Sequence, residues 1–397
     1  MMLVALLWIG LSIAAGALAM TIWNLALYCR PRADAPARAE MVTVCIPARN
    51  EERNLEVCVR AVLAQDHDAL RVLVYDDGST DGTADILDRL CRENVRVEAC
   101  PVHPHPPGWV GKQFACDQMG LHAGGEYLLF IDADVRLAPD CIRRALDSAH
   151  QLRADLLSTF PRQVTGSIGE QLLVPMIHFI LFSYLPFVRM RRTNDPAASA
   201  ACGQFVLVQR EAYLAAGGHA SVRDSMHDGV KLPRVFRRAG FRTDLFDGTD
   251  LASCRMYEGL GATWRGFAKN AYEGLGSPGL LVFLTVLHLL GHVLPWVVLA
   301  WAAAAWIGEE GGPAAASPAT MAVVLAALAC TLNIVQRGLL SRRFAQGLLP
   351  VGAHPLGVLM MTAVQWYSFV LQLRGARAWR GRAGPLASGA RREMAQT

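Results

Sequence analysis

The sequence predicts an α/β domain built on a mostly parallel sheet, with membrane-spanning helices at both of its ends. Of the 397 residues, 53% are hydrophobic and 18% are charged, which is too apolar for an ordinary soluble protein and too charged for a pure membrane bundle. Between residues 41 and 277, short apolar segments alternate with helical ones, and long uncharged segments lie on either side. A soluble domain joined to membrane segments accounts for both observations.

The first element is the apolar run from Leu3 to Tyr28, which is longer than the roughly 20 residues that a spanning helix needs. Arginines follow it at positions 30, 32 and 38, which favours a cytoplasmic location for the next segment. Ala17-Leu18-Ala19 resembles a signal-peptide cleavage site, but no positive charge precedes the apolar core. We therefore expect an uncleaved anchor over residues 1–30 and a linker over residues 31–40.

Four strands are expected next, over residues 42–46, 72–75, 95–99 and 127–131, with helices over about 55–64 and up to about 93. The fourth strand ends in Asp132-Ala133-Asp134. The carboxyl ends of parallel strands form the ligand edge of an open α/β sheet, and two carboxylates there suit Mg²⁺ or Mn²⁺. Taken alone the triplet is common, and a solvated turn is the alternative.

Polar residues also follow the second strand, in Asp76-Asp77-Gly78-Ser79. These carboxylates can accept hydrogen bonds from a nucleoside, but a glycine-rich turn capped by aspartate explains them equally well. Farther along, Gly108-Trp109-Val110-Gly111-Lys112 ends in a lysine. This lysine either meets a diphosphate as a point charge or is simply solvated at the start of a helix.

Together these residues resemble the family 2 glycosyltransferases with the GT-A fold. The resemblance rests on Pro47-Ala48-Arg49-Asn50-Glu51, Asp76-Asp77-Gly78-Ser79-Thr80-Asp81 and Asp132-Ala133-Asp134, in order and each at a strand end. The lysine motif, Gly203-Gln204-Phe205 and Cys254-Arg255-Met256-Tyr257 are similar to a membrane-bound branch with carotenoid- and hopanoid-associated enzymes. The similarity covers roughly residues 41–277.

The resemblance implies a Rossmann-like nucleotide-diphospho-sugar transferase domain over residues 41–277. Its donor, a nucleotide-sugar that is expected to carry uridine, would contact Pro47, Asn50, Glu51, Asp76, Asp77, Lys112, Asp132 and Asp134. Of these, Asn50, Glu51 and Asp77 would face the uridine, and Asp132 and Asp134 would hold Mg²⁺ or Mn²⁺. Accessory or acceptor contacts are expected from Gln204, His227, Arg255 and Trp264.

An inverting transfer also needs a base on the far side of the sugar, and the candidate is Asp228. A helix beginning near Pro233 would place its positive end by this carboxylate, although Asp228 could also simply cap that helix. Much of the family has Glu before this Asp, where His227 stands here. The role of His227, as a supporting partner or an acceptor contact, stays open.

The pentapeptide Gln-x-x-Arg-Trp of polysaccharide synthases is absent, which makes processive synthesis a weaker expectation. In that region, Arg255 can pair with a phosphate. Trp264 can stack on a sugar or a lipid, but a lone Trp in a helix more often anchors it in a core or at a membrane interface.

Residues 172–188 are almost entirely apolar, and arginines follow at 189, 191 and 192. A single crossing here would put Asp132 and Asp228 on opposite sides of the membrane, so we expect an interfacial segment with the arginines at lipid headgroups. Residues 278–373 should then form two spans, separated by an acidic turn at 308–312, and a third span or re-entrant hairpin, before a basic tail over 374–397. Arginines flank the last segment on both sides, which favours a cytoplasmic tail.

The ten scattered cysteines show neither zinc spacing nor a disulfide framework, and the net charge of +4 favours a membrane surface over nucleic acid as a partner. The favoured hypothesis is an inverting glycosyltransferase of the cell (inner) membrane, multi-pass with its domain in the cytoplasm. It would move a sugar from a nucleotide-sugar to a membrane lipid or isoprenoid-like acceptor. The alternatives are a sugar transferase acting on a polyprenyl phosphate, a noncatalytic scaffold or binding protein, and a small transporter.

Overall fold

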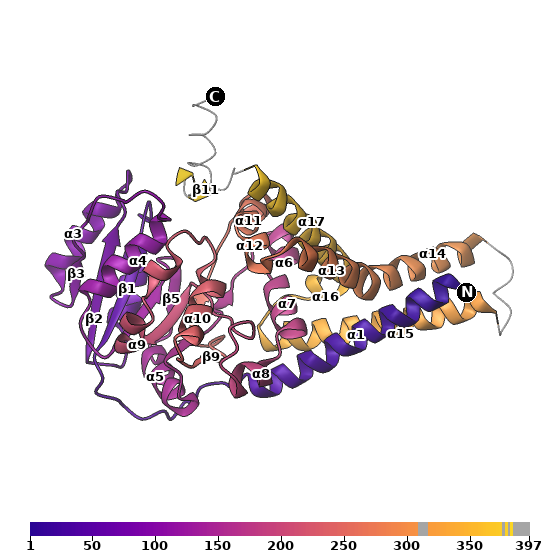
Figure 1. The fold of residues 1–397 in the computed structure, drawn as a ribbon, viewed down its shortest axis with the longest axis horizontal. Helices are drawn as coiled ribbons and strands as arrows, with labels where there is room; N and C mark the ends of the chain where they lie inside the picture. The colour runs from indigo at the N-terminus through magenta and orange to yellow at the C-terminus, as the bar shows by residue number, and fades with distance from the viewer. Residues whose placement is uncertain (309–316, 375–377, 380–381, 384–397) are drawn as a thin grey trace. The chain divides into compact units, whose positions relative to one another are not determined.

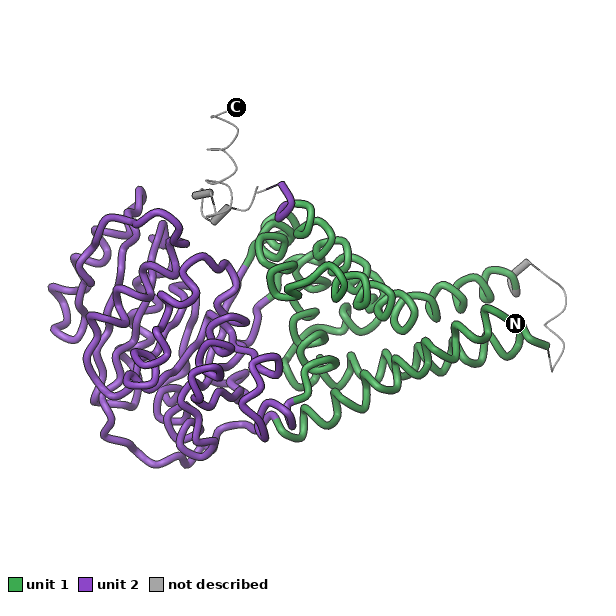
Figure 2. Tube along the Cα trace, viewed as in Figure 1, with its two compact units in different colours: residues 1–27, 165–186, 257–370 green, residues 28–164, 187–256, 371–397 purple. Residues whose placement is uncertain are grey.

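The computed structural model describes residues 1–308, 317–374, 378–379 and 382–383. The chain divides into two compact units, which Figure 2 colours separately. Unit 1, built from helices, comprises residues 1–27, 165–186 and 257–370, and unit 2, which contains the main sheet, comprises residues 28–164, 187–256 and 371–397. These units reflect compactness alone, so the domain and membrane boundaries expected from the sequence stay predictions.

Unit 2 is built on a seven-stranded sheet in the order β3-β2-β1-β4-β8-β6-β9 (Figure 1). Its strands are β1 (Val42–Ala48), β2 (Leu70–Asp76), β3 (Val97–Ala99), β4 (Tyr127–Ile131), β6 (Leu156–Ser158), β8 (Phe205–Gln209) and β9 (Thr243–Leu245). The first four strands are parallel, as predicted. β8, however, runs antiparallel to both β4 and β6, so the sheet is mixed.

Helices cover both faces of this sheet. They are α2 (Leu55–Leu63), α3 (Thr83–Glu93), α4 (Gly111–His122), α5 (Cys141–Leu152), α9 (Arg210–Ala215) and α10 (Asp228–Arg238), with the shorter α8 (Phe187–Arg192) and η1 (His219–Val222) beside them. Successive side chains of a strand point to opposite faces. Val44 and Ile46 of β1 therefore pack in the core that contains α2, α3 and α5, and Cys45 packs in the core with α4, α9 and α10.

A smaller sheet continues from the end of β4. Its strands are β5 (Val135–Leu137), β7 (Arg162–Gln163) and β10 (Ala252–Cys254), with β10 in the centre. β10 pairs antiparallel with β5, and its register sets Cys254 opposite Val135. This register brings Cys254 next to Asp134, the second aspartate of the predicted metal motif.

Helix α10 begins at Asp228 and not near Pro233, so the predicted helix start was wrong. Proline inside a helix removes the N–H that would serve the carbonyl four residues earlier, here that of Gly229. The backbone N–H of Ala201 donates to this carbonyl instead, at 2.7 Å, and the helix tolerates the proline. Asp228 is thereby the first residue of α10.

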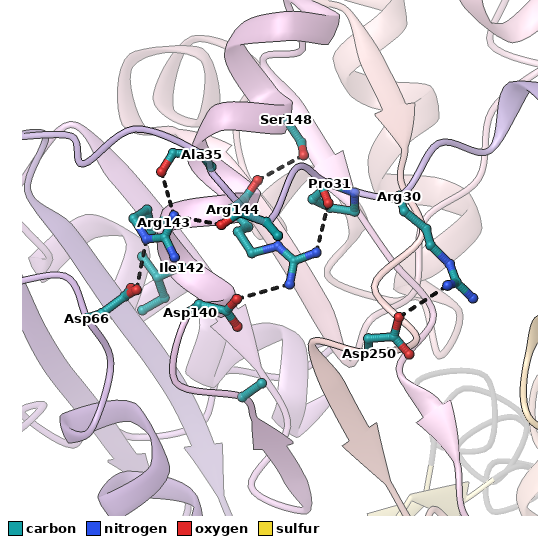
Figure 3. Close-up of polar contacts among 12 residues, drawn as sticks. Arg30, Pro31, Ala35, Asp66, Asp140, Ile142, Arg143, Arg144, Ser148 and Asp250 are labelled. Atoms are coloured by element: carbon teal, nitrogen blue, oxygen red, sulfur yellow. Dashed lines mark hydrogen bonds and ion pairs between the residues drawn. The ribbon is translucent and has the colours of Figure 1, made fainter.

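The predicted linker over residues 31–40 packs on the domain. Two neighbouring arginines of α5 hold it by its backbone (Figure 3). Arg144 Nη2 donates to the carbonyl of Pro31 at 2.7 Å, and Arg143 Nη1 donates to the carbonyl of Ala35. Each arginine also forms an ion pair with a nearby carboxylate, which fixes the guanidinium.

Among the described residues, four helices are long and apolar enough to cross a membrane: Met2–Leu27, Pro278–Ala305, Pro318–Arg343 and His354–Leu373. The first of them is α1 (Met2–Leu27), and the second is formed by α13 (Pro278–His288), η2 (Leu289–Val293) and α14 (Leu294–Gly308) together. The third is α15 (Pro318–Arg343), and the fourth is α17 (His354–Leu373). Shorter helices of unit 1 are α6 (Ile168–Leu173), α7 (Met176–Tyr184), α11 (Gly259–Ala268), α12 (Ala271–Leu275) and α16 (Leu349–Gly352). The predicted anchor and both predicted spans thus correspond to continuous helices.

The predicted interfacial segment over 172–188 is divided among α6, α7 and α8, with Pro175 before α7 and Pro186 after it. Each of these helices is too short to cross a membrane alone. Of the arginines expected at headgroups, Arg191 instead forms an ion pair with Asp244, with 3.0 Å between Nε and Oδ2. Asp244 is buried and needs a cation, which explains why Arg191 turns toward β9 of the main sheet.

Helix α17 is unbroken over 354–373, so no hairpin turn lies within these residues. It lies beside α13 and runs antiparallel to it. At its start, His354 Nε2 is 3.2 Å from His292 Nδ1 of η2, and near its end the Ser368 hydroxyl accepts from the N–H of Tyr272 in α12. The end of α17 therefore lies beside α12, the element that precedes α13 in the sequence. The predicted acidic turn and most of the basic tail lie outside the described residues, apart from β11 (Ala378–Trp379) and β12 (Arg382–Ala383).

Candidate active site

The predicted motifs meet at the carboxyl edge of the main sheet. β1 and β2 lie side by side with Ala48 opposite Asp76, and β4 pairs with the other side of β1. Asp77 and Asp132 come directly after β2 and β4, and Asn50 is the second residue after β1. Parallel strands place their carboxyl ends together, so the sequence order of the motifs is enough to assemble them.

The turns that follow β1 and β2 are joined by hydrogen bonds. Asn50 has a positive φ of 55°, which asparagine tolerates better than most residues, and its Oδ1 accepts from the N–H of Thr80 at 2.8 Å. Asp76 Oδ1 accepts from the N–H of Ser79 at 3.0 Å. These two side chains therefore build the turn itself, as the capping alternative for Asp76 supposed.

Two buried carboxylates lie in these turns. Glu51 is 8% exposed and accepts a hydrogen bond from Asn54 Nδ2 at 2.9 Å. Asp77 is 7% exposed and forms an ion pair with Arg49, with 3.6 Å between Nη1 and Oδ2. Two residues that were expected to face the nucleoside thus lie in the turns at the carboxyl edge of the sheet.

Lys112, near the start of α4, lies between two carboxylates that the sequence assigned to different roles. Its Nζ is 2.7 Å from Asp132 Oδ1 and 3.1 Å from Asp228 Oδ2, and it donates to the carbonyl of Gly203 at 3.1 Å. These contacts use all three donors of an ammonium group. The metal candidate and the base candidate, which are far apart in sequence, are thus joined through one lysine.

Lys112, Asp132 and Asp228 form a triad in which opposite charges stabilise one another. Burial alone would lower the pKa of Lys112, but Asp132 and Asp228 outweigh it and raise that pKa well above its usual value. Burial alone would raise the pKa of Asp228, but the charge and hydrogen bond of Lys112 lower it to about 2. Asp228 is therefore ionised at neutral pH, as a base must be, although such a low pKa makes it a weak base.

Asp134 is in a different electrostatic state. Its Oδ1 is buried without a hydrogen-bond partner among the described residues. Burial first, and then the charges of Asp132 and Glu51, raise its pKa to about 7. An orphaned carboxylate oxygen beside a second carboxylate suits a divalent cation. The described residues contain no cluster of three His, Cys, Asp or Glu side chains set to hold a metal, so other ligands would have to come from substrate or water.

A series of hydrogen-bonded side chains leads to Asp134. Gln163 Nε2 donates to Gln204 Oε1 at 2.9 Å, Gln204 Nε2 donates to Cys254 Sγ at 3.0 Å, and the Cys254 thiol hydrogen-bonds Asp134. Gln204 is 5% exposed, which places it behind the site. The sequence singled out Gln204 and the segment around Cys254, but it gave no sign of Gln163.

The other accessory candidates are not members of the triad. His227 precedes α10, and its N–H donates to Ser225 Oγ at 3.0 Å. Arg255 is exposed directly after β10. Trp264 belongs to α11 of unit 1, where its ring centroid lies 6.2 Å from that of Tyr367. Trp264 thus packs between helices, as the anchoring alternative supposed.

A small cavity of about 10 Å³ lies beside the triad, about enough space for one water molecule. It is lined by Pro47, Lys112, Cys116, Phe130, Ile131, Asp132, Gly203, Val206, His219, Asp228 and Leu232. Burial lowers the pKa of His219 to about 4, and its Nδ1 is 2.9 Å from the Tyr213 hydroxyl. The sequence did not single out this neutral histidine, because a lone His in a glycine-rich turn matches no recognisable motif.

Residues 43–215 match the family model described as Glycosyl transferase family 2. The chain carries a family 2 glycosyltransferase domain. The matched segment contains Asp132 and Asp134 and ends before Asp228, so the base candidate rests on the geometry of this chain. The strand-end motifs that suggested the family from the sequence all lie within or at the edge of the matched residues.

Among curated proteins, the domain is similar to 4,4'-diaponeurosporenoate glycosyltransferases of Staphylococcus aureus. The protein of strain USA300 is 29% identical over 262 residues, which cover 64% of this chain and 66% of the relative. The protein of strain MRSA252 is 30% identical with the same coverage. The chain thus matches just under two thirds of the length of these relatives.

Among solved structures, the chain is similar to the mannosyltransferase PcManGT from Pyrobaculum calidifontis in complex with GDP-Man and Mn²⁺. The TM-score is 0.56 at 19% identity, and the match covers 93% of this chain and 99% of that one. At this identity the similarity shows the fold alone. With the family match, it confirms the predicted GT-A-like fold of the glycosyltransferase domain.

Proposed function

We propose that this protein is a membrane-bound, inverting glycosyltransferase that moves a sugar from a nucleotide-sugar to a lipid-like acceptor. One observation carries the proposal: Lys112 joins Asp132, at the end of β4, to Asp228, at the start of α10, with contacts of 2.7 and 3.1 Å. A group that binds a donor diphosphate and a group that deprotonates an acceptor must face the same sugar from two sides. The triad supplies both groups in one place.

On the donor side, Asp132 and Asp134 fit a divalent cation, because the buried Oδ1 of Asp134 otherwise has no partner in the described part of the chain. Mg²⁺ and Mn²⁺ both accept such oxygen ligands. When bound, the ion would neutralise charge on the leaving diphosphate. The similar mannosyltransferase was solved with both GDP-Man and Mn²⁺ bound, which supports the same assignment here.

On the acceptor side, Asp228 would take the proton of the attacking hydroxyl. Its pKa of about 2 is set by Lys112, so the strength of this base depends on where the lysine points. A donor diphosphate would compete with Asp228 for the ammonium group. Lys112 turning toward the diphosphate would then leave Asp228 a stronger base only when the donor is bound.

The acceptor is proposed to be a lipid for two reasons. The curated relatives are named for 4,4'-diaponeurosporenoate, and four helices in the described part of this chain have the length and composition of membrane spans. We propose that the donor site and the acceptor site of the domain open to the cytoplasm of a bacterial cell, where nucleotide-sugars are made. The helices would hold the domain at the inner membrane.

The test is transfer of labelled sugar to extractable lipid. Membranes that contain the protein are incubated with labelled nucleotide-sugars and Mn²⁺, and the lipids are extracted and counted. We expect labelled lipid with wild type, and a loss of at least about a hundredfold with Asp132→Asn or Asp134→Asn. Nucleotide-sugar binding without any labelled product, across a panel of donors and lipid extracts, would support the scaffold alternative instead.

A further inference from the structure

The helices of unit 1 enclose a group of basic side chains that sugar transfer does not use. Arg337 of α15 is 1% exposed, His354 of α17 is 1% exposed, and His288 and His292 are fully buried. They surround the ring of Phe179. Its centroid is 4.9 Å from that of His292, 5.0 Å from that of His354, 6.2 Å from that of His288 and 5.9 Å from Arg337 Cζ. We name the four basic residues the Arg337 cluster.

The cluster is built around a π-helical turn, η2, in the middle of a candidate spanning helix. Such turns often occur at functional sites. Pro295 has no N–H to offer to the carbonyl of Gly291, and Asn333 Nδ2 of α15 donates to this carbonyl instead, at 3.1 Å. The side chain of Asn333 is therefore oriented with its oxygen toward His292.

This orientation fixes the protons of two histidines. Because Asn333 Oδ1 can only accept, His292 Nδ1 donates to it, at 2.7 Å. His354 Nε2, which is 3.2 Å from the same nitrogen, must then be an acceptor, so its proton sits on Nδ1. His354 Nδ1 is buried and has no hydrogen-bond partner among the described residues, and neither ring nitrogen of His288 has one. The cluster thus presents buried N–H groups that lack an acceptor.

The cluster also lacks a negative charge. Arg337 donates to the carbonyls of Pro350 and Pro175 at 3.4 and 3.3 Å, which are long contacts with neutral groups. In the described part of the chain, no carboxylate lies within 4 Å of its guanidinium. A buried cation among apolar helices is costly unless it is paired, and such residues usually mark a binding site or a path for a polar ligand.

We propose that the Arg337 cluster binds the oxyanion head group, a carboxylate or a phosphate, of an amphiphile with an apolar chain. An oxyanion supplies the acceptors and the negative charge that the cluster lacks. The apolar chain follows from the surroundings, because the helices that carry the cluster expose apolar side chains such as Phe283 and Leu356. The inference rests on the proposed function only in taking these helices to lie in a membrane.

Phe179 occupies the centre of the cluster in this structure. Its ring compensates the charge of Arg337 through a cation–π contact. A head group must displace this ring to reach the guanidinium. Removal of the ring by Phe179→Ala should therefore leave binding at least as tight as in wild type, whereas a cluster that only packs helices together would gain nothing from it.

The test uses the full chain in phosphatidylcholine nanodiscs, titrated with laurate, dodecyl phosphate, dodecanol and inorganic phosphate, with empty nanodiscs as the reference. We expect saturable binding of laurate, of dodecyl phosphate or of both, and none of dodecanol. Binding of inorganic phosphate would identify a free anion as the ligand and overturn the requirement for an apolar chain. Arg337→Gln should weaken binding at least about tenfold, whereas Arg342→Gln, at an exposed position of the same helix, should not change it.

Unchanged laurate and dodecyl phosphate affinity in an Arg337→Gln protein that keeps the wild-type melting temperature would overturn the proposal. If this variant does not fold, a photoreactive laurate decides on wild type alone, because its crosslinks should map to α7, α13, η2, α15 or α17, and crosslinks confined to other elements would exclude the cluster. Asp228→Asn separates the two proposals. It should abolish sugar transfer and bind the amphiphile like wild type.

Discussion

At the scale of single residues, Lys112 controls the electrostatics of the site. We expect Lys112→Gln to leave Asp132 and Asp228 as neighbouring unpaired carboxylates, which raises the pKa of Asp228 from about 2. A base must be ionised, so the acidic limb of the pH profile of kcat/KM should move to higher pH by about one unit or more. Transfer at pH 7 should fall at least about tenfold for a different reason, because the donor diphosphate loses the ammonium group that would contact it.

The matched control is Arg71→Gln, which removes one positive charge from an exposed position of β2. Its pH profile should overlay that of wild type. An acidic limb that stays in place in Lys112→Gln would show that Lys112 does not set the ionisation of the group that limits transfer.

Asp134 gives a second prediction, which concerns stability. Its folded-state pKa of about 7 lies above the ordinary value of about 3.9, so the folded protein holds a proton that the unfolded chain releases. The buried charge thus destabilises the metal-free protein above pH 7, and this effect is relieved as the pH falls from 7 toward 4. Asp134→Asn should raise the melting temperature by a few degrees at pH 8 and by less at pH 5. Each kcal/mol of added stability corresponds to about 2–4 °C in the melting temperature.

When Mn²⁺ and a nucleoside diphosphate are present, wild type should instead melt at a higher temperature than the variant. These ligands stabilise wild type by binding its folded state, whereas the variant has no carboxylate at position 134 to bind the metal. Thermal unfolding in detergent at pH 5 and 8, with and without these ligands, measures both effects. A variant that melts below wild type at pH 8 without metal would contradict a buried charge at Asp134.

Which residues can be found from sequence depends on how their positions are fixed. Asp132 and Asp134 follow a strand directly, and a parallel sheet must bring such residues to one edge. Gln163 and His219 reach the site through a two-residue strand and a 3₁₀ turn, where no periodicity marks them. Their positions depend on tertiary packing, which a single sequence does not show.

At the scale of elements, the start of α10 is held in place by a close approach of two backbone segments. A Cβ on Gly203 would lie 2.4 Å from Asp228 Oδ1, and the same glycine offers its carbonyl to Lys112. We expect Gly203→Ala to displace the Asp228 carboxylate and to reduce kcat about a hundredfold, with little change in binding of the nucleotide-sugar. Kinetics and equilibrium binding on one preparation check both parts.

Gly124→Ala is the control, because a Cβ there meets nothing within 4 Å. The expected result is wild-type kinetics. Equal kcat in the Gly203 and Gly124 variants would mean that the position of Asp228 is not critical for transfer.

The error in the predicted start of α10 also belongs to this scale. Pro233 is typical of a first helical turn, and local rules placed the start there. The backbone N–H of Ala201, from a segment that is distant in sequence, serves the carbonyl that the proline cannot. A long-range hydrogen bond of this kind lies outside local sequence rules, whereas the strands of the sheet core follow from their apolar runs alone.

At the scale of the whole molecule, composition predicted a soluble domain combined with membrane helices, and the described residues contain both a GT-A-like domain and four apolar helices of spanning length. The sequence did not reveal that α17 runs back along α13 toward α12. In a membrane, this return would leave the end of α17 on the side where α13 begins. The cytoplasmic location of the tail stays a prediction, which rests on the flanking arginines.

The central claim, that Asp228 is the base of an inverting transfer to a lipid, is tested most directly by Asp228→Asn. Membranes with the variant are assayed for labelled sugar in extracted lipid, and nucleotide-sugar binding is measured on the purified protein. We expect transfer to fall at least about a thousandfold while nucleotide-sugar binding stays within a few fold of wild type. Full transfer by the variant would contradict the claim and point to an acceptor that is already ionised, such as a polyprenyl phosphate.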